Sequence, residues 1–323
     1  MLHPILNMRF KAMLWYQGES NLDGFEGTWA GSRNYACRSR AAVVDWRAKF
    51  ELPELPFFFV ELAACNNYDS AQYTFPILRQ ATRAVLSLPN TGSITAIDVG
   101  IPSGGVHSPV KQPDGQRMGL QLRANVYGEN VVADGPVLAT PPKASGASVI
   151  LTFANAANGL HLNAVSGASP LPGFGCAQSP FWFGFSDGSW VRADANRTAI
   201  DAAAATVTLG AAPLLDGSNL GARQLTEVRY AWEGFVQCAL YSGTAGGWND
   251  TAVGVLPAAP FRSAVSTGCS TATQTACTVS DGVQCCINTD VKPYLLGGEV
   301  CTPNGGGCQC KGCVGSKVPF GVA

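Results

Sequence analysis

Charged residues are scarce in this sequence, and their scarcity excludes several classes of protein. Asp, Glu, Lys and Arg together make up 13% of the 323 residues, whereas about 25% is usual for a globular domain. The formal net charge is −1, so the charge balance gives no reason to expect binding to nucleic acid or to an anionic membrane surface. We therefore expect neither partner.

Long apolar runs are missing as well. A membrane-spanning helix needs about 20 consecutive apolar residues, and the longest candidate, residues 55–65, is interrupted by Pro56 and Glu61. No secretory signal peptide begins the chain. That absence says little if the natural protein starts upstream of Met1.

Cysteine is plentiful but unevenly distributed. Eight of the twelve cysteines fall in the last 55 residues, at Cys269, Cys277, Cys285, Cys286, Cys301, Cys308, Cys310 and Cys313. An even number in a Gly-rich tail with little helical pattern favours disulfides and an oxidising compartment. Zinc is the alternative, but the tail has no second clean C-x-x-C pair and no nearby His. Sequons at Asn196 and Asn249 agree with secretion and glycosylation.

Helical and extended patterns alternate over residues 1–134. Because strands that alternate with helices form parallel βαβ units, this half predicts an α/β fold with helices on both faces of a sheet. Three strands are few for a self-sufficient domain, so the pattern favours a partial sheet. The predicted strands are 12–14, 55–62 and 93–97, and the predicted helices are 32–50, 72–88 and 115–127.

Residues 135–262 have a different pattern. Short apolar runs such as 148–153, 181–185, 206–209 and 228–232 are separated by Gly, Asn, Asp and Pro clusters. This spacing predicts an all-β, sandwich-like domain. Residues 263–323 lack periodicity, and we expect a disulfide-dependent appendage or a disordered segment.

The stretch WYQGESN, from Trp15 to Asn21, follows the first predicted strand. A strand that ends in Gln, Gly, Glu, Ser and Asn delivers several polar groups to the carboxyl rim of the sheet, where open α/β sheets bind ligands. An ordinary polar loop would have the same composition. The residues alone leave both interpretations open.

WYQGESN resembles the third conserved block of the sialate O-acetylesterases, a branch of the SGNH hydrolases. The resemblance extends over roughly residues 1–262, and further segments follow in the order of the family. These segments are MLHPILNMRFKAMLWYQGESN (1–21), VVDWRAKF (43–50), PFFFVELA (56–63), FPILRQA (75–81), residues 98–128 and LTEVRYAW (225–232).

The resemblance implies a secreted or lysosomal hydrolase that cleaves O-acetyl esters on sialic acid or related carbohydrates by Ser-His-Asp chemistry, without a cofactor. It also implies a partial three-layer α/β/α sheet of the SGNH type. The nucleophilic Ser of the family lies in a Gly-Gln-Ser-Asn block that this sequence lacks. The chain therefore looks like the C-terminal portion of such an esterase.

The resemblance assigns His107 as the catalytic base, because HSPVKQPDGQRMG looks like the His-led block of the family. The family usually has Pro directly after this His, whereas Ser108 intervenes here. Of the other two histidines, we expect His3 to pack and His161 to lie on a surface. Many SGNH enzymes carry Asp three residues before the His, where this chain has Gly104.

Asp98, at the end of the third predicted strand, is the nearest carboxylate that could orient His107; it could equally well hold its own loop. Asp114 could also be considered, but it falls on the next predicted helix.

Gln17 and Gly18 resemble the part of the family block that supplies an amide donor to the oxyanion, which is suitable chemistry for developing negative charge. Glu19 is expected to hold the loop rather than to transfer a proton.

Two alternatives remain. Ser20 in Gly-Glu-Ser resembles a nucleophile turn, and Ser20, Asp98 and His107 follow the SGNH chain order, which would make the chain a complete small esterase. A non-catalytic carbohydrate-binding or cell-surface module is the second alternative. Its candidate residues are the aromatics of the β-rich half, namely Phe181, Trp182, Phe183, Phe185 and Trp190, although we favour packing in the core and loops as the explanation for them.

Overall fold

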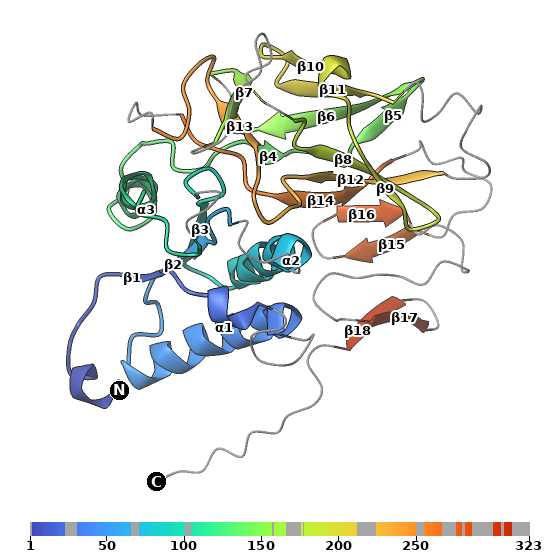
Figure 1. Ribbon diagram of the computed structural model, residues 1–323. Coiled ribbons are helices and arrows are strands. Elements are labelled where there is room, and N and C mark those ends of the chain that lie inside the picture. The colour runs from blue at the N-terminus through green and yellow to red at the C-terminus, as the bar shows by residue number, and fades with distance from the viewer. Residues whose placement is uncertain are drawn as a thin grey trace. The chain divides into compact units, whose positions relative to one another are not determined.

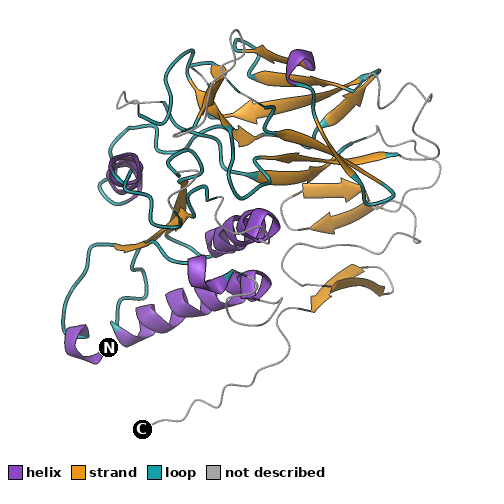
Figure 2. Cartoon of the chain, in the orientation of Figure 1, coloured by secondary structure: helices purple, strands orange, loops and turns teal. Residues whose placement is uncertain are grey.

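The computed structural model describes residues 2–22, 31–65, 71–100, 105–156, 158–165, 176, 178–211, 224–249, 255–266, 276–279, 282–285, 300–304 and 307–311. The chain divides into two compact units, residues 1–267 and 268–323. Helices gather in the first part of the chain and strands dominate the rest (Figure 2). Among the described helices, none has the length and apolarity needed to cross a membrane.

A parallel sheet lies at the beginning of the first unit (Figure 1). Its strands, β1 (Met13–Trp15), β2 (Phe57–Glu61) and β3 (Thr91–Thr95), are arranged in the order β1-β2-β3. Met13 pairs with Phe57, and Phe57 pairs with Thr91. The predicted α/β fold with a parallel sheet is therefore confirmed. Because the strands are parallel, their carboxyl ends meet at one rim.

Side chains alternate between the two faces of this sheet, and each face packs against different helices. These are α1 (Gly31–Lys49), α2 (Ala71–Arg83) and α3 (Gln112–Asn125). Phe57 and Phe59 share a buried cluster with Val43 of α1. Phe58 and Val60 share another with Met118 of α3. The four consecutive apolar residues that begin β2 are thus explained by burial on both sides of the sheet.

Short 3₁₀ helices complete this part of the chain: η1 (His3–Ile5), η2 (Glu19–Asn21) and η3 (Ala84–Ser87). The expectation that His3 packs is wrong, because His3 is exposed. Pro4 at the start of η1 favours this one-turn helix, and a helix of three residues has too little surface to bury the ring.

The remaining strands of the first unit form antiparallel sheets. One has the order β10-β11-β6-β4, with β5 also on β6; another has the order β14-β12-β8-β9; and β13 pairs with β7. Their bounds are β4 (Val137–Leu138), β5 (Lys143–Ser145), β6 (Ser148–Ala154), β7 (Leu160–Ala164), β8 (Phe181–Phe185), β9 (Trp190–Arg192), β10 (Thr198–Asp201), β11 (Thr206–Gly210), β12 (Leu225–Tyr230), β13 (Cys238–Ser242) and β14 (Phe261–Ala264), with η4 (Ala195–Arg197) before β10.

One hydrophobic core joins the two larger antiparallel sheets. Val149 and Leu151 of β6 are fully buried in it, as are Phe181 and Phe183 of β8. Phe185 belongs to the same core. These three phenylalanines therefore pack in the core, which is the explanation that the sequence analysis set against a carbohydrate-binding role.

Arg79 of α2 connects the parallel sheet to the β-rich half. Its buried guanidinium donates to the carbonyl oxygens of Leu62 and Ala63 beyond β2, and to those of Glu233 and Gly234 beyond β12. Burial lowers the pKa of Arg79 to about 10. These bonds place the segment after β12 beside the residues that follow β2.

A disulfide joins Cys176 to Cys238 in β13, with their Cα atoms 5.3 Å apart. The second unit contains two hairpins, β15 (Ala276–Val279) with β16 (Gly282–Cys285) and β17 (Val300–Asn304) with β18 (Gly307–Lys311). The side chains of the eight tail cysteines lie outside the described part of the structure, so their pairing stays a prediction.

Candidate active site

Gln17 lies directly beyond β1, and neighbouring groups fix its side chain. Its Nε2 donates to Asn21 Oδ1 over 2.7 Å. The Tyr35 hydroxyl of α1 lies 2.8 Å from the Gln17 carbonyl oxygen and 3.1 Å from Gln17 Oε1. A primary amide has two N–H donors, and the bond to Asn21 uses one. The remaining N–H could donate a hydrogen bond to an oxygen that gains negative charge during a reaction.

Gly18 follows in a backbone conformation that favours glycine. Its φ is +151° and its ψ is −17°, and a Cβ atom added there would lie 2.7 Å from Leu78 Cδ2 of α2. The chain thus turns at Gly18 with its backbone pressed against α2, and 3₁₀ helix η2 begins at the next residue.

We expect Gly18→Ala to lower the free energy of unfolding by about 1–3 kcal/mol, because it combines overpacking with an unfavourable φ. Urea denaturation would measure the change. Gly115→Ala is the matched control, since nothing lies within 4 Å of its added Cβ and alanine favours the helix. If both variants kept the stability of the parent, the tight packing at Gly18 would be refuted.

His107 lies in the loop between β3 and α3, and its side chain is exposed. The buried residue after it, Ser108, donates through Oγ to the Val99 carbonyl oxygen over 2.5 Å. The same Oγ accepts from the Val110 backbone N–H over 3.2 Å. Ser108, the departure from the family pattern, therefore ties the loop to the end of β3. Residues 101–104 are outside the described structure.

A shared hydrophobic cluster brings the β1 and β3 loops to the same rim. Tyr16, beside Gln17, and Val106, beside His107, both pack against a cluster that includes Leu62 and Leu78. The neighbours of Gln17 and His107 thus meet in one core. This places both candidate residues at the carboxyl rim, as the sequence predicted.

Asp98 is fully buried beneath this rim. Its two oxygens accept from Arg117 Nη1 and Nη2 over 2.7 and 2.6 Å, and Oδ2 also accepts from the Tyr241 hydroxyl over 2.8 Å. Among the described residues, no hydrogen bond joins Asp98 to His107. Its role in orienting His107 stays a prediction, whereas its contacts connect β3, α3 and β13.

The other members of the WYQGESN stretch form one turn. Glu19 begins η2 and is half-buried, and the Asn21 backbone N–H donates to the Gly18 carbonyl oxygen over 2.8 Å. The loop-holding role of Glu19 stays a prediction. Ser20 is exposed, and no described hydrogen bond joins Ser20 to His107. The geometry therefore lends no support to Ser20 as the nucleophile.

Asp114, in the first turn of α3, is more unusual than the sequence suggested. It is buried, and neither of its oxygens has a hydrogen-bond partner among the described residues. Burial raises its pKa to about 6, against the smaller opposing effects of Arg117 and Lys111. Lys111 also donates to the Tyr16 hydroxyl over 2.9 Å. The Asp114 carboxyl group is thus buried without hydrogen bonds from the described residues to offset the loss of its hydration.

Asp114 gives a pH-dependent prediction. Because its pKa rises from 3.8 to about 6 on folding, the folded state holds the proton more tightly. The free energy of unfolding should therefore fall as pH rises from about 4 to 6, by about 3 kcal/mol from this residue. Asp114→Asn should remove that part of the pH dependence, as measured by urea denaturation at several pH values.

The control for this experiment is Asp45→Asn, which alters an exposed carboxylate paired with Lys49. This variant should keep the pH dependence of the parent protein between pH 4 and 6. An Asp114→Asn protein with that same unchanged pH dependence would show that Asp114 titrates normally in the folded state.

A cavity of about 200 Å³ adjoins Gln17 on the α1 side of the sheet. Its wall includes Trp15, Asn21, Tyr35 and Phe59 in addition to Gln17. β1 is also the end strand of its sheet, and Leu14 on that strand is 48% exposed. The candidate site therefore lies beside a strand edge that carries an exposed apolar side chain.

Comparison with known proteins shows which class of protein part of this chain is similar to. Residues 2–127 match the family described as carbohydrate esterase, sialic acid-specific acetylesterase. In solved structures, the chain is similar to a carbohydrate acetylesterase from Xanthomonas citri, with a TM-score of 0.60, 25% identity, and coverage of 81% of this chain and 52% of that one.

Curated relatives give the particular family. The chain is 34% identical over 154 residues to the sialate O-acetylesterase of Mus musculus, and 32% identical to that of Homo sapiens. The aligned part is 42% of this chain, and it spans 27% and 28% of those two proteins. The resemblance seen in the sequence is confirmed: residues 2–127 match the sialic acid-specific acetylesterase family of carbohydrate esterases, and the relatives matched are sialate O-acetylesterases.

Proposed function

We propose that this chain forms part of a carbohydrate acetylesterase that removes O-acetyl groups from sialic acid or a related sugar. The observation that carries the proposal is Gln17, which lies beyond β1 with its amide held by Asn21 and Tyr35, within a segment of the esterase family. The three parallel strands are then part of a larger three-layer α/β/α sheet, and the all-β half is its sandwich-like companion.

In this proposal the rim acts on an acetyl ester bound next to Gln17. A serine hydroxyl attacks the acetyl carbonyl carbon while His107 accepts its proton. The free amide N–H of Gln17 donates to the oxyanion that forms. The intermediate then collapses and its bond to the sugar oxygen breaks; that oxygen takes the proton from His107 and leaves as a hydroxyl group. Water attacks the acetyl-serine in the same two steps, which releases acetate and restores the serine hydroxyl.

In this proposal the nucleophilic serine lies outside these 323 residues. Ser20 is exposed and has no described bond to His107, and no described strand pairs with the outer edge of β1. The Met13 backbone N–H donates to the Pro56 carbonyl oxygen, on the side of β2. Because successive residues of a parallel strand face opposite edges, the N–H and C=O groups of Leu14 point away from β2. A strand carrying the serine could add to that edge beside Gln17.

Asp98 is the acid of the site in this proposal, and it acts by holding in place the segment from which the His107 loop departs. Through Arg117 and Tyr241 it fixes the end of β3, from which the His107 loop departs. Glu19 has the corresponding task in the β1 loop. Both are positioning residues in this proposal, whereas Gln17 and His107 touch the reacting atoms.

The test uses the natural chain extended upstream to include a Gly-Gln-Ser-Asn block. Gln17→Ala in that protein should lower kcat for an acetylated sialic acid by about 10²–10³, the usual cost of losing one oxyanion donor. Gln112→Ala, at an exposed position on α3, is the control and should keep full activity. Equal activity of the Gln17→Ala protein and the control would refute the role of Gln17.

We further propose that the protein is a glycoprotein of the secretory route or the lysosome. Asn196 and Asn249 of the two sequons are both exposed, and the Cys176–Cys238 disulfide agrees with an oxidising compartment. Thiol titration of the denatured, unreduced protein checks this. Reaction of most tail cysteines, or stoichiometric zinc, would contradict it.

A further inference from the structure

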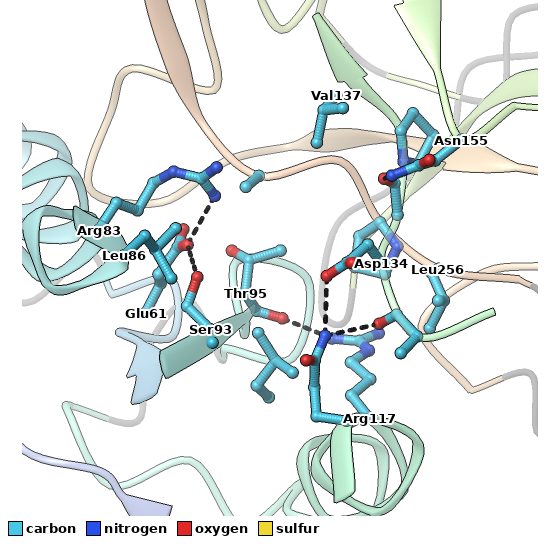
Figure 3. A pocket seen from close by; sticks show the side chains of 18 of the residues that line it. Glu61, Arg83, Leu86, Ser93, Thr95, Arg117, Asp134, Val137, Asn155 and Leu256 are labelled. Carbon is cyan, nitrogen blue, oxygen red and sulfur yellow. Dashed lines mark hydrogen bonds and ion pairs between the residues drawn. The ribbon is translucent and has the colours of Figure 1, made fainter. Parts of the chain in front are cut away.

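A second cavity, of about 370 Å³, lies along the edge of β3 on which no described strand pairs. Figure 3 shows Glu61, Ser93 and Thr95 on one side of it and Arg117, Asp134 and Asn155 on the other. Gln17, Gly18 and His107 are not in its wall. The cavity is therefore separate from the rim, which lies beyond the ends of the strands.

The floor of this cavity offers main-chain hydrogen-bonding groups. The Phe57 N–H donates to Asn90 O, and the Ala96 N–H donates to Glu61 O. In a parallel pair the residues alternate between facing the partner and facing away. Thr91, Ser93 and Thr95 therefore direct their main-chain groups outward, toward the cavity, and Arg117 Nη1 already bonds the Thr95 carbonyl oxygen over 2.9 Å.

Two side chains in the wall carry polar atoms without partners among the described residues. Glu61 is fully buried, and its Oε1 accepts from Arg83 over 2.9 Å and from Ser93 over 3.0 Å, while its Oε2 has no partner. Thr95, directly opposite Glu61 in the strand register, has no partner for Oγ1. Buried polar atoms are normally hydrogen-bonded, so Glu61 Oε2 and Thr95 Oγ1 could each form a further hydrogen bond.

The charges of the wall balance. Its charged residues are Glu61, Arg83, Arg117 and Asp134. Glu61 pairs with Arg83, and Arg117 pairs with Asp98 just outside the wall. Asp134 accepts from Gln121 over 2.8 Å. A cation or an anion would have to compete with these bonds, so a neutral ligand fits better.

The far wall is apolar and closely packed. Leu256, Pro257 and Val137 contribute to it, and a Cβ atom on Gly135 would lie 2.1 Å from Pro257 O. The segment of Gly135 is thus held against the segment of Pro257. The volume is within the range of about 300–1,000 Å³ that is usual for small-molecule sites, and it can hold a ligand of monosaccharide size.

We propose that this cavity binds a neutral polyhydroxyl compound of monosaccharide size, through the outward edge of β3 and the unpartnered atoms of Glu61 and Thr95. A hydroxyl group both donates and accepts, so it can serve the carboxylate, the threonine and the main-chain groups together. An apolar ring face can rest on Leu256 and Val137. The proposal does not depend on the esterase activity.

Ligand-observed NMR and calorimetry on the 323-residue chain test the proposal. The probes are the methyl glycosides of glucose, galactose and mannose at roughly 10 mM, a concentration that detects millimolar affinity. At least one should bind. Thr95→Val, which keeps the shape but removes Oγ1, should weaken it about tenfold, as for one lost hydrogen bond, and Thr95→Ser should restore it.

Further variants locate the site. Ala133→Trp, which fills the cavity from its wall, should abolish binding, whereas Thr208→Val on β11, outside the wall, should leave it unchanged. Failure of all three glycosides to bind would overturn the proposal and leave a cavity that holds only water. Binding that survives Ala133→Trp, or tighter binding of acetate or methylammonium than of any glycoside, would overturn it too.

Discussion

Replacing Asp98 by Ala is expected to lower the free energy of unfolding by about 3–5 kcal/mol, the usual cost of breaking a buried ion pair by removing one partner. Asp98 is fully buried, and the Arg117 side chain is 7% exposed. The substitution would leave a buried guanidinium without its carboxylate, and it would also remove the acceptor of the Tyr241 hydroxyl. Chemical denaturation of the 323-residue chain measures the loss.

Two further variants make this prediction specific. Asp45→Ala removes a carboxylate from an exposed pair with Lys49 and should leave the stability nearly unchanged. The double variant Asp98→Ala, Arg117→Met should recover part of the loss, because it removes the unpaired charge as well. An Asp98→Ala protein as stable as the parent would show that the buried contacts of Asp98 do not hold the first unit together.

Replacing His107 by Ala should lower kcat for an acetyl ester by about 10⁴–10⁶ in the extended, active protein, as in hydrolases that lose the general base of a triad. Since the His107 side chain is exposed, the same change should leave the denaturation midpoint where it was. The separation of the two effects, activity lost and stability kept, identifies a residue that acts on the substrate.

His161→Ala supplies the opposite pattern as a control. The two ring nitrogens of His161 each lie 2.8 Å from a carbonyl oxygen, those of Gly243 and Gly246, and the ring stacks on Tyr241. This variant should lose stability and keep its turnover at temperatures where it is folded. Full activity of His107→Ala would remove His107 from the mechanism.

Much of the fold could be predicted because its elements follow local rules. The apolar spacing of Tyr35, Val43 and Phe50 predicted a helix over 32–50; Tyr35 and Val43 of α1 are buried, and so is Phe50 directly after its end. The apolar residues within 55–62 predicted a strand buried on both faces, as β2 is. In such segments the spacing of a few neighbouring apolar residues is enough to predict which side chains are buried.

The buried charges could not be predicted in the same way. Arg79 and Arg117 look like ordinary surface residues of helices, yet both are buried, because their partners come from distant segments. Asp98 contacts Arg117, 19 residues away, and Tyr241, 143 residues away. No local pattern encodes such contacts, which is why the sequence left both roles of Asp98 open, orienting His107 or holding its own loop.

The candidate site shows the same division. The polar end of WYQGESN and the position of His107 after the third strand predicted a shared rim, and the cluster that contacts Tyr16 and Val106 agrees with it. The part played by Ser108 became visible only with Val99 and Val110 beside it. The unsatisfied carboxylate of Asp114 likewise depends on burial that spacing does not reveal.

The central claim is that these residues form an esterase rim whose nucleophile lies outside the 323-residue chain. Treating that chain with a fluorophosphonate, which labels activated serines, followed by peptide mass spectrometry, tests it most directly. We predict no labelled serine, and no acetyl-ester hydrolysis above background. Labelling of Ser20, together with hydrolysis that Ser20→Ala abolishes, would contradict the claim and make this chain an esterase by itself.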